Sequence, residues 1–222
     1  MRSRAARGAG VPTDTVFIVD DDESFARSIA RLVQAAGWNA RVFPCAGEFL
    51  DLADPRNGEA ACVLLDVKMP GMKGPDVYRA MLDRKMTMPV VFLTGHGDVP
   101  TSVDVMKLGA VDFLEKPVPR DTLIRTIRGA LARDAEALQH ERERREIEER
   151  VAQLSPRERE VMGHVIAGRL NKQIAADLGI SLKTVKAHRA KVMEKMRAGS
   201  VAALVDLCRV AGIQPAIAAT NG

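Results

Sequence analysis

The sequence has little of what a disulfide-stabilised, zinc-binding or membrane-spanning protein needs. Its three cysteines, Cys45, Cys62 and Cys208, are far apart, and its four histidines form no cluster. A disulfide framework and a zinc site are therefore not expected, whereas a reducing cytoplasm is. No apolar run approaches the ~18 residues that a membrane-spanning helix requires. With one Trp, one Tyr and six Phe among 46% hydrophobic residues, the cores should be mainly aliphatic.

Charged residues are plentiful but unevenly spread along the 222-residue chain. Residues 14–118 hold 11 basic and 16 acidic side chains, and residues 119–154 hold 8 of each. Residues 155–222 reverse the balance, with 11 basic and 5 acidic side chains. An acidic front and a basic back predict two domains, of which the second is suited to binding a polyanion.

Four apolar runs in the first part end in residues that carry chemistry. Helical patterns alternate with these runs, which predicts βαβ units and a parallel sheet. Because parallel strands end at one edge of their sheet, the residues that follow them should meet there. A single Asp after a strand is more often a turn or a helix cap, but here the arrangement recurs. The runs are Val16–Val19, Val63–Leu65, Val90–Leu93 and Val111–Leu114, and they lead into Asp20, Asp21, Asp66, Thr94 and Lys116.

This set of side chains is suited to receiving a phosphoryl group. Three neighbouring carboxylates resist joint ionisation unless a positive charge compensates them. A hard divalent cation such as Mg²⁺, bound through oxygen ligands, would do so. The remaining groups are a nucleophilic carboxylate, a hydroxyl and an ammonium, which together can attack and stabilise a phosphoryl group.

These residues resemble the receiver domain of two-component response regulators, which is a flavodoxin-like α/β fold with a five-stranded parallel sheet. The segment 94–100, Thr-Gly-His-Gly-Asp-Val-Pro, is typical of the FixJ branch of the NarL/FixJ family. The resemblance implies that phosphorylation remodels the face formed by a helix over 99–108 and the strand 111–114. It assigns Asp66 as phospho-acceptor, Asp20, Asp21, Asp66 and the Lys68 main-chain carbonyl as Mg²⁺ ligands, Thr94 and Phe113 as switch residues, and Lys116 as the active-site lysine.

The segment that follows should join two domains through a helix. Pro119 and Asp121 begin a helix that runs through Leu131, and residues 134–150 are dense in both charges. Ion pairs four residues apart favour a solvated linker helix. A short dimeric coiled coil is the alternative, and its best seam decays from apolar to charged along its length. The seam residues are Ile124, Leu131, Leu138, Arg145 and Ala152.

The basic part has the pattern of a helix-turn-helix. Ser155 and Glu158 form a capping box, and two helices are joined by a turn between Gly179 and Ser181. On the second helix, 182–196, spacing turns Val185, His188, Val192 and Met196 inward. Residues 154–213 resemble the LuxR-type DNA-binding domain, an all-α domain of four helices. The face left for DNA carries Lys183, Thr184, Lys186, Ala187, Ala190 and Lys191.

The sequence therefore predicts a cytoplasmic transcription factor controlled by phosphorylation, not an enzyme beyond accepting and losing its own phosphoryl group. The expected partners are a sensor histidine kinase, double-stranded promoter DNA and a second copy upon phosphorylation, with RNA polymerase as a further candidate and no membrane. A DNA-binding regulator with a vestigial receiver is the alternative. A metal-dependent phosphohydrolase is disfavoured, because Lys68 stands where such enzymes have a second Asp. The expected segments are a disordered leader (1–13), the receiver core (14–118), the last receiver helix and linker helix (119–153), the DNA-binding domain (154–213) and a flexible tail (214–222).

Overall fold

A computed structural model describes residues 14–52, 58–95 and 109–216. The leader and the helix predicted over 99–108 lie outside these residues. The chain forms two compact units that divide between Leu138 and Gln139. None of the described helices is both long and apolar enough to cross a bilayer.

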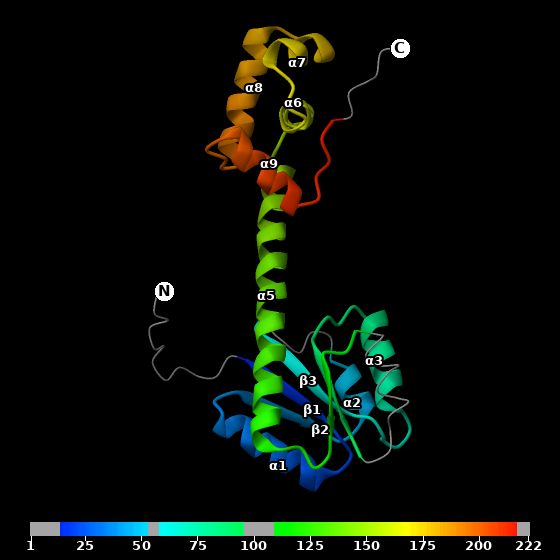
Figure 1. Cartoon of the computed structure of the whole chain (residues 1–222). Coiled ribbons are helices and arrows are strands. Elements are labelled where there is room, and N and C mark those ends of the chain that lie inside the picture. Colours follow the sequence, from blue (N-terminus) through cyan, green and yellow to red (C-terminus); the bar gives the residue numbers. More distant parts are fainter. Residues whose placement is uncertain (1–13, 53–57, 96–108, 217–222) are drawn as a thin grey trace. The chain divides into compact units, whose positions relative to one another are not determined.

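The first unit contains a five-stranded parallel sheet in the order β2-β1-β3-β4-β5 (Figure 1). The central strand β3 is buried over its whole length, as its continuous apolar run predicts. This arrangement confirms the predicted α/β fold class. The strands are β1 (Thr15–Val19), β2 (Asn39–Phe43), β3 (Ala61–Asp66), β4 (Val90–Thr94) and β5 (Asp112–Glu115).

Each face of the sheet has its own core, because successive strand residues point to opposite sides. Phe17 and Val63 pack with α2 and α3, whereas their neighbours Ile18 and Leu64 pack with α1 and the first part of α5. Both cores consist mainly of aliphatic side chains, with phenylalanine and methionine in the first. The helices are α1 (Glu23–Ala35), α2 (Ala46–Leu50), α3 (Gly74–Asp83) and α5 (Arg120–Ala152).

Helix α5 is uninterrupted over 33 residues. Its first part is a true receiver helix, and Leu131 lies in the core against the sheet at 4% exposure. Asp134, which the sequence assigned to the charged linker, is also buried, and its Oδ2 accepts a hydrogen bond of 2.8 Å from the Ala61 amide. Leu131 is therefore not available to the coiled-coil seam. Farther along, Arg145 pairs with Glu141 at 3.0 Å on the exposed surface, as the spacing predicts.

The second unit is built from four helices around one core, joined by Ile147 from the end of α5. The predicted capping box forms at Ser155 and Glu158, and Gly179 ends α7 in the left-handed conformation. After the last helix, the Ala216 amide donates to the Gly163 carbonyl at 3.0 Å, so the first residues of the expected flexible tail are packed. The helices are α6 (Pro156–Ile166), α7 (Asn171–Leu178), α8 (Leu182–Lys195) and α9 (Val201–Val210).

Candidate functional site

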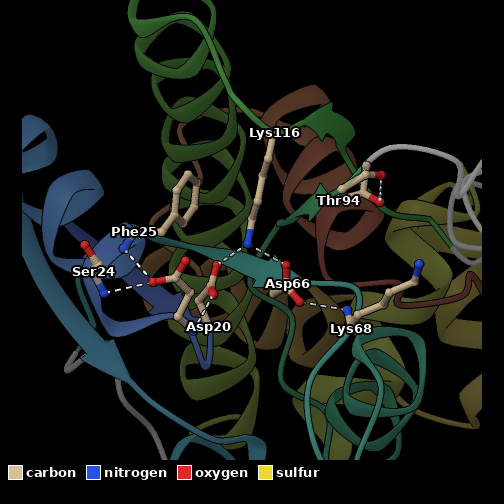
Figure 2. Close-up of polar contacts among 9 residues, drawn as sticks. Asp20, Ser24, Phe25, Asp66, Lys68, Thr94 and Lys116 are labelled. Atoms are coloured by element: carbon tan, nitrogen blue, oxygen red, sulfur yellow. Dashed lines mark hydrogen bonds and ion pairs between the residues drawn. The ribbon is translucent and has the colours of Figure 1, made fainter.

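The ends of β1 and β3 and the residue after β5 meet at one edge of the sheet (Figure 2). The Lys116 Nζ lies 2.6 Å from Asp20 Oδ2 and 2.6 Å from Asp66 Oδ1. Asp20 and Asp66 are 1% and 6% exposed. One ammonium thus holds two buried carboxylates that come from different strands.

The second oxygen of each carboxylate accepts a main-chain amide. The Asp22 amide donates to Asp20 Oδ1 at 3.0 Å, and the Lys68 amide donates to Asp66 Oδ2 at 2.7 Å. Both amides belong to the residue two places further along the chain, so each loop fixes the side chain that begins it. The two carboxylates are therefore oriented before any ligand binds.

The local electrostatics leave an excess of negative charge. When Asp20 and Asp66 are both ionised, Lys116 balances only one of them. Burial raises the pKa of Asp20, although its hydrogen bond with Lys116 acts in the opposite direction. Burial alone would lower the pKa of Lys116, but its hydrogen bonds to the two carboxylates outweigh this and raise the pKa. The lysine stays protonated, and the pair of carboxylates calls for further positive charge.

The oxygen ligands at this edge suit a hard cation, although not all of the predicted ligands lie close together. Asp20, Asp66 and the main-chain oxygen of Lys68 offer the ligand type that Mg²⁺ prefers. The Asp21 side chain is exposed. Within 14–52, 58–95 and 109–216, no three His, Cys, Asp or Glu side chains already stand at metal-binding distances. The residues fit a Mg²⁺ ion by chemistry, and binding would require Asp21 to join the other two.

The loop after Asp66 turns back tightly against it. The Gly74 amide donates to the Val67 carbonyl at 3.0 Å. A Cβ at Gly74 would collide with the Asp66 carbonyl oxygen, so this position requires glycine. Helix α3 can thus begin directly beside the main chain at the end of β3.

Thr94 ends β4 at this edge of the sheet, whereas Phe113 lies within β5. Thr94 is buried at 2% exposure, and its hydroxyl donates to the Gly95 carbonyl at 3.0 Å. The Lys116 amide donates to the Thr94 carbonyl at 2.6 Å. This main-chain hydrogen bond joins the two residues whose side chains carry the hydroxyl and the ammonium. Phe113 is half-buried against the core that contains α3.

In the second unit, α8 separates a buried face from a basic face. Val185, Val192 and Met196 are fully buried, as predicted, and His188 is half-buried with its Nδ1 enclosed. Thr184 is half-buried, and its hydroxyl lies 2.8 Å from that of the cap Ser181. Five of the six residues predicted to face DNA are exposed, and we call them the basic face of α8: Lys183, Lys186, Ala187, Ala190 and Lys191.

Comparison with known proteins assigns each unit to a known domain type. A model of the response regulator receiver domain matches residues 16–128, and a model of bacterial regulatory proteins of the luxR family matches residues 152–208. The transcriptional regulatory protein FixJ of Azorhizobium caulinodans is 42% identical over 205 residues, covering 92% of this chain and 96% of that protein. The chain belongs to the NarL/FixJ family of two-component response regulators.

Other response regulators of the same architecture are similar over most of the chain. The tetrathionate response regulatory protein TtrR of Salmonella typhimurium is 41% identical over 191 residues, which covers 86% of this chain and 90% of TtrR. The solved structure of the response regulator StyR matches with a TM-score of 0.79 at 38% identity and covers 88% of this chain and 98% of StyR. Full-length FixJ from B. japonicum matches with a TM-score of 0.54 at 42% identity, covering 89% and 97%. The predicted family and the predicted phosphorylation-dependent control of transcription are confirmed.

Two further side-chain contacts of this response regulator cannot be predicted from local spacing. The Phe25 ring, assigned only to the core, lies over the Lys116 ammonium at 4.3 Å. The Lys195 ammonium lies 2.6 Å from Glu158, which the sequence assigned only to the capping box. Each contact joins residues far apart in the chain, and local spacing carries no signal for such a pairing.

Proposed function

We propose that this response regulator is phosphorylated on Asp66. The observation that carries the proposal is the Lys116 ammonium held 2.6 Å from Asp66 at a buried strand end. An Asp66 oxygen forms the new bond to phosphorus, while the bond from phosphorus to the histidine nitrogen of the kinase breaks. That nitrogen keeps the electron pair. Lys116 then binds a phosphoryl oxygen.

The added charge explains why the site needs cations. The phosphoryl group brings about −1.5 to −2 charges to an edge where one ammonium already serves two carboxylates. Asp20, Asp21, Asp66 and the Lys68 main-chain carbonyl would hold Mg²⁺, which neutralises part of this charge when bound. Among these groups Asp20, fixed by the Asp22 amide, would act through a water.

Thr94 and Phe113 carry the switch in this proposal. The Thr94 hydroxyl leaves the Gly95 carbonyl and donates to the phosphoryl group, which gives the ligand a contact made in one state only. The half-buried Phe113 then turns into the space that Thr94 leaves. The predicted surface over 99–108 lies outside the described residues. The outcome is a dimer formed through the receiver.

The test compares the wild type with Asp66→Asn. Acetyl phosphate and Mg²⁺ should add one phosphoryl group to the wild type and none to the variant, as read by intact mass. Sedimentation of the same samples should show a mass increase for the wild type only. Stoichiometric labelling of Asp66→Asn would reject Asp66 as the acceptor. A labelled wild type that sediments and binds DNA as before would favour the vestigial receiver.

We also propose that the basic face of α8 enters the major groove of promoter DNA. Lys186, Ala187 and Ala190 are exposed and would face base edges, since the two small side chains permit close approach. Lys183 and Lys191 would reach phosphates, and Thr184 would lie near the backbone beside Ser181. Arg189 is engaged by Asn171 of α7 at 2.8 Å, which favours a role in holding the two helices together.

Two lysine variants of this face distinguish base contact from phosphate contact. Lys191→Ala should weaken binding to specific and scrambled duplexes alike. It should also reduce the slope of log affinity against log salt concentration by about one unit. Lys186→Ala should reduce discrimination between the duplexes by roughly 1–3 kcal/mol. Both are measured by titration across a salt series, with Lys172→Ala on the neighbouring α7 as an exposed control. Identical behaviour of the two variants would mean that another face of α8 meets the DNA.

A further inference from the structure

Phe25 lies in the first turn of α1, beside the acidic edge of the sheet. Its ring centroid is 4.3 Å from the Lys116 Nζ, close enough for the negative face of the ring to attract the ammonium (Figure 2). The same ammonium donates to Asp20 and Asp66 at 2.6 Å. The lysine is thus bounded by two carboxylates and one aromatic face.

The backbone around Phe25 is fixed by the acidic segment itself. The Asp22 side chain accepts hydrogen bonds from the Ser24 and Phe25 amides, each at 3.0 Å, and caps α1. The Asp22 amide in turn holds Asp20. The position of Phe25 relative to Lys116 is therefore set by the same turn that orients an active-site carboxylate.

A ring at this place restrains the ammonium in a way that an aliphatic side chain cannot. The Lys116 side chain keeps 21% of its surface exposed and has a long flexible stem. Two carboxylates from different strands pull on it, and either one could hold it away from the other. The ring adds a third, non-ionic attraction and takes up space that water would fill. Phe25 also packs against the core between the sheet and α1, so an ordinary packing role has to be separated by experiment.

We propose that Phe25 is a positioning residue for phosphoryl transfer, one that holds the Lys116 ammonium between Asp20 and Asp66. The proposal rests on the assignment of Asp66 as the phospho-acceptor. The ring touches neither the acceptor nor the phosphoryl group and acts through Lys116. A side chain with an aromatic face should preserve this role, and one without it should lose it.

The experiment compares three variants of the full chain. Phe25→Leu removes the ring but keeps apolar bulk, Phe25→Tyr keeps the ring, and Leu32→Ala loosens packing of α1 against the same core. With acetyl phosphate and Mg²⁺, Phe25→Leu should be labelled about three- to tenfold more slowly than wild type. Phe25→Tyr and Leu32→Ala should stay within about twofold, a difference of less than half a unit of log rate.

A spectroscopic measurement reports on Lys116 without depending on labelling. The ε-methylene protons of Lys116 should be shifted upfield by the ring in wild type and Phe25→Tyr, and should return to ordinary lysine positions in Phe25→Leu. Wild-type labelling rates in Phe25→Leu, or equal slowing in Leu32→Ala, would overturn the positioning role while leaving Asp66 assigned. If the wild type is not labelled, or Asp66→Asn is, the proposed function fails and the role of Phe25 fails with it, even if the upfield shift is present.

Discussion

Each unit of the molecule contains a lysine 2.6 Å from a buried carboxylate, yet the two contacts differ in balance. Lys116 serves two carboxylates at the open edge of a sheet. Lys195 serves one, Glu158, and also donates to the Gln153 carbonyl at 3.1 Å. The same Glu158 oxygen accepts from the Ser155 amide at 2.9 Å. The pair of Lys195 and Glu158 is neutral, whereas the group of Lys116, Asp20 and Asp66 is one positive charge short.

The pKa directions express this difference. The hydrogen bond from Lys195 is the main cause that lowers the pKa of Glu158 to about 2. The ionised form of Glu158 therefore stabilises the fold. Burial raises the pKa of Asp20, so ionising it works against the fold. A similar contact distance therefore does not define a similar role. The unbalanced group is the one prepared to take a ligand.

The largest expected effect comes from removing the ammonium of the unbalanced site. Lys116→Ala should slow labelling by acetyl phosphate about 100-fold or more, because it removes a charge aimed at the transferring group. Arg79→Ala, which removes an exposed cation from α3, is the control. Intact mass over time measures both. Labelling of Lys116→Ala at near the wild-type rate would show that the lysine has a structural role only.

Removing the other lysine should affect stability instead of chemistry. Lys195→Ala leaves Glu158 without its cation and should destabilise the second unit by about 1–2 kcal/mol, less than for an enclosed pair because 35% of the Lys195 side chain is exposed. Hydrogen exchange of α6 and α8 amides in the full chain measures this locally. Lys172→Ala, exposed on α7, serves as the control. Unchanged exchange in Lys195→Ala would place this pair among the weak surface contacts.

The smallest effect is a difference in acid sensitivity. Since the pKa of Glu158 is lowered from 4.5 to about 2, its stabilisation is complete above pH 4.5 and is lost as the pH falls towards about 2. Glu158→Gln should abolish this loss. The single tryptophan, Trp38, lies in the receiver, so its fluorescence follows that unit while helical circular dichroism follows both. Loss of the dichroism signal at the same pH in wild type and Glu158→Gln would contradict this account.

The edge residues were predictable because strand ends are a local signal. Asp20, Asp66 and Thr94 each follow an apolar run, and parallel pairing brings such residues together whatever the details of packing. Lys116 was predictable in the same way, since it follows the next strand, β5. The capping box at Ser155 was equally accessible, since it spans three residues.

What escaped prediction depends on contacts distant in sequence. Asp134 lies in a run of charged residues and its sequence context suggests exposure. In the structure α5 packs against the sheet, so that Asp134 is buried and accepts a hydrogen bond from Ala61 at the start of β3. Phe25 has the spacing of a core residue, and nothing local shows that its ring also meets Lys116. The Glu158 carboxylate has two partners, of which only Ser155 is near in the chain. Spacing predicts the face on which a residue lies and leaves its distant partner open.

The hydrogen bond between Ala61 and Asp134 also has a consequence for the order in which the protein can be made. The two residues are separated by 73 positions, so at roughly 5–20 residues per second the partner is synthesised about 4 to 15 seconds later. By the end of this interval the site residues from Asp20 to Lys116 have all been made, while one face of the sheet still awaits α5. A nascent chain therefore carries every group needed for phosphoryl transfer before it can hold them in a finished domain. Slower translation after Lys116 would lengthen the time for which that apolar face is open to chaperones.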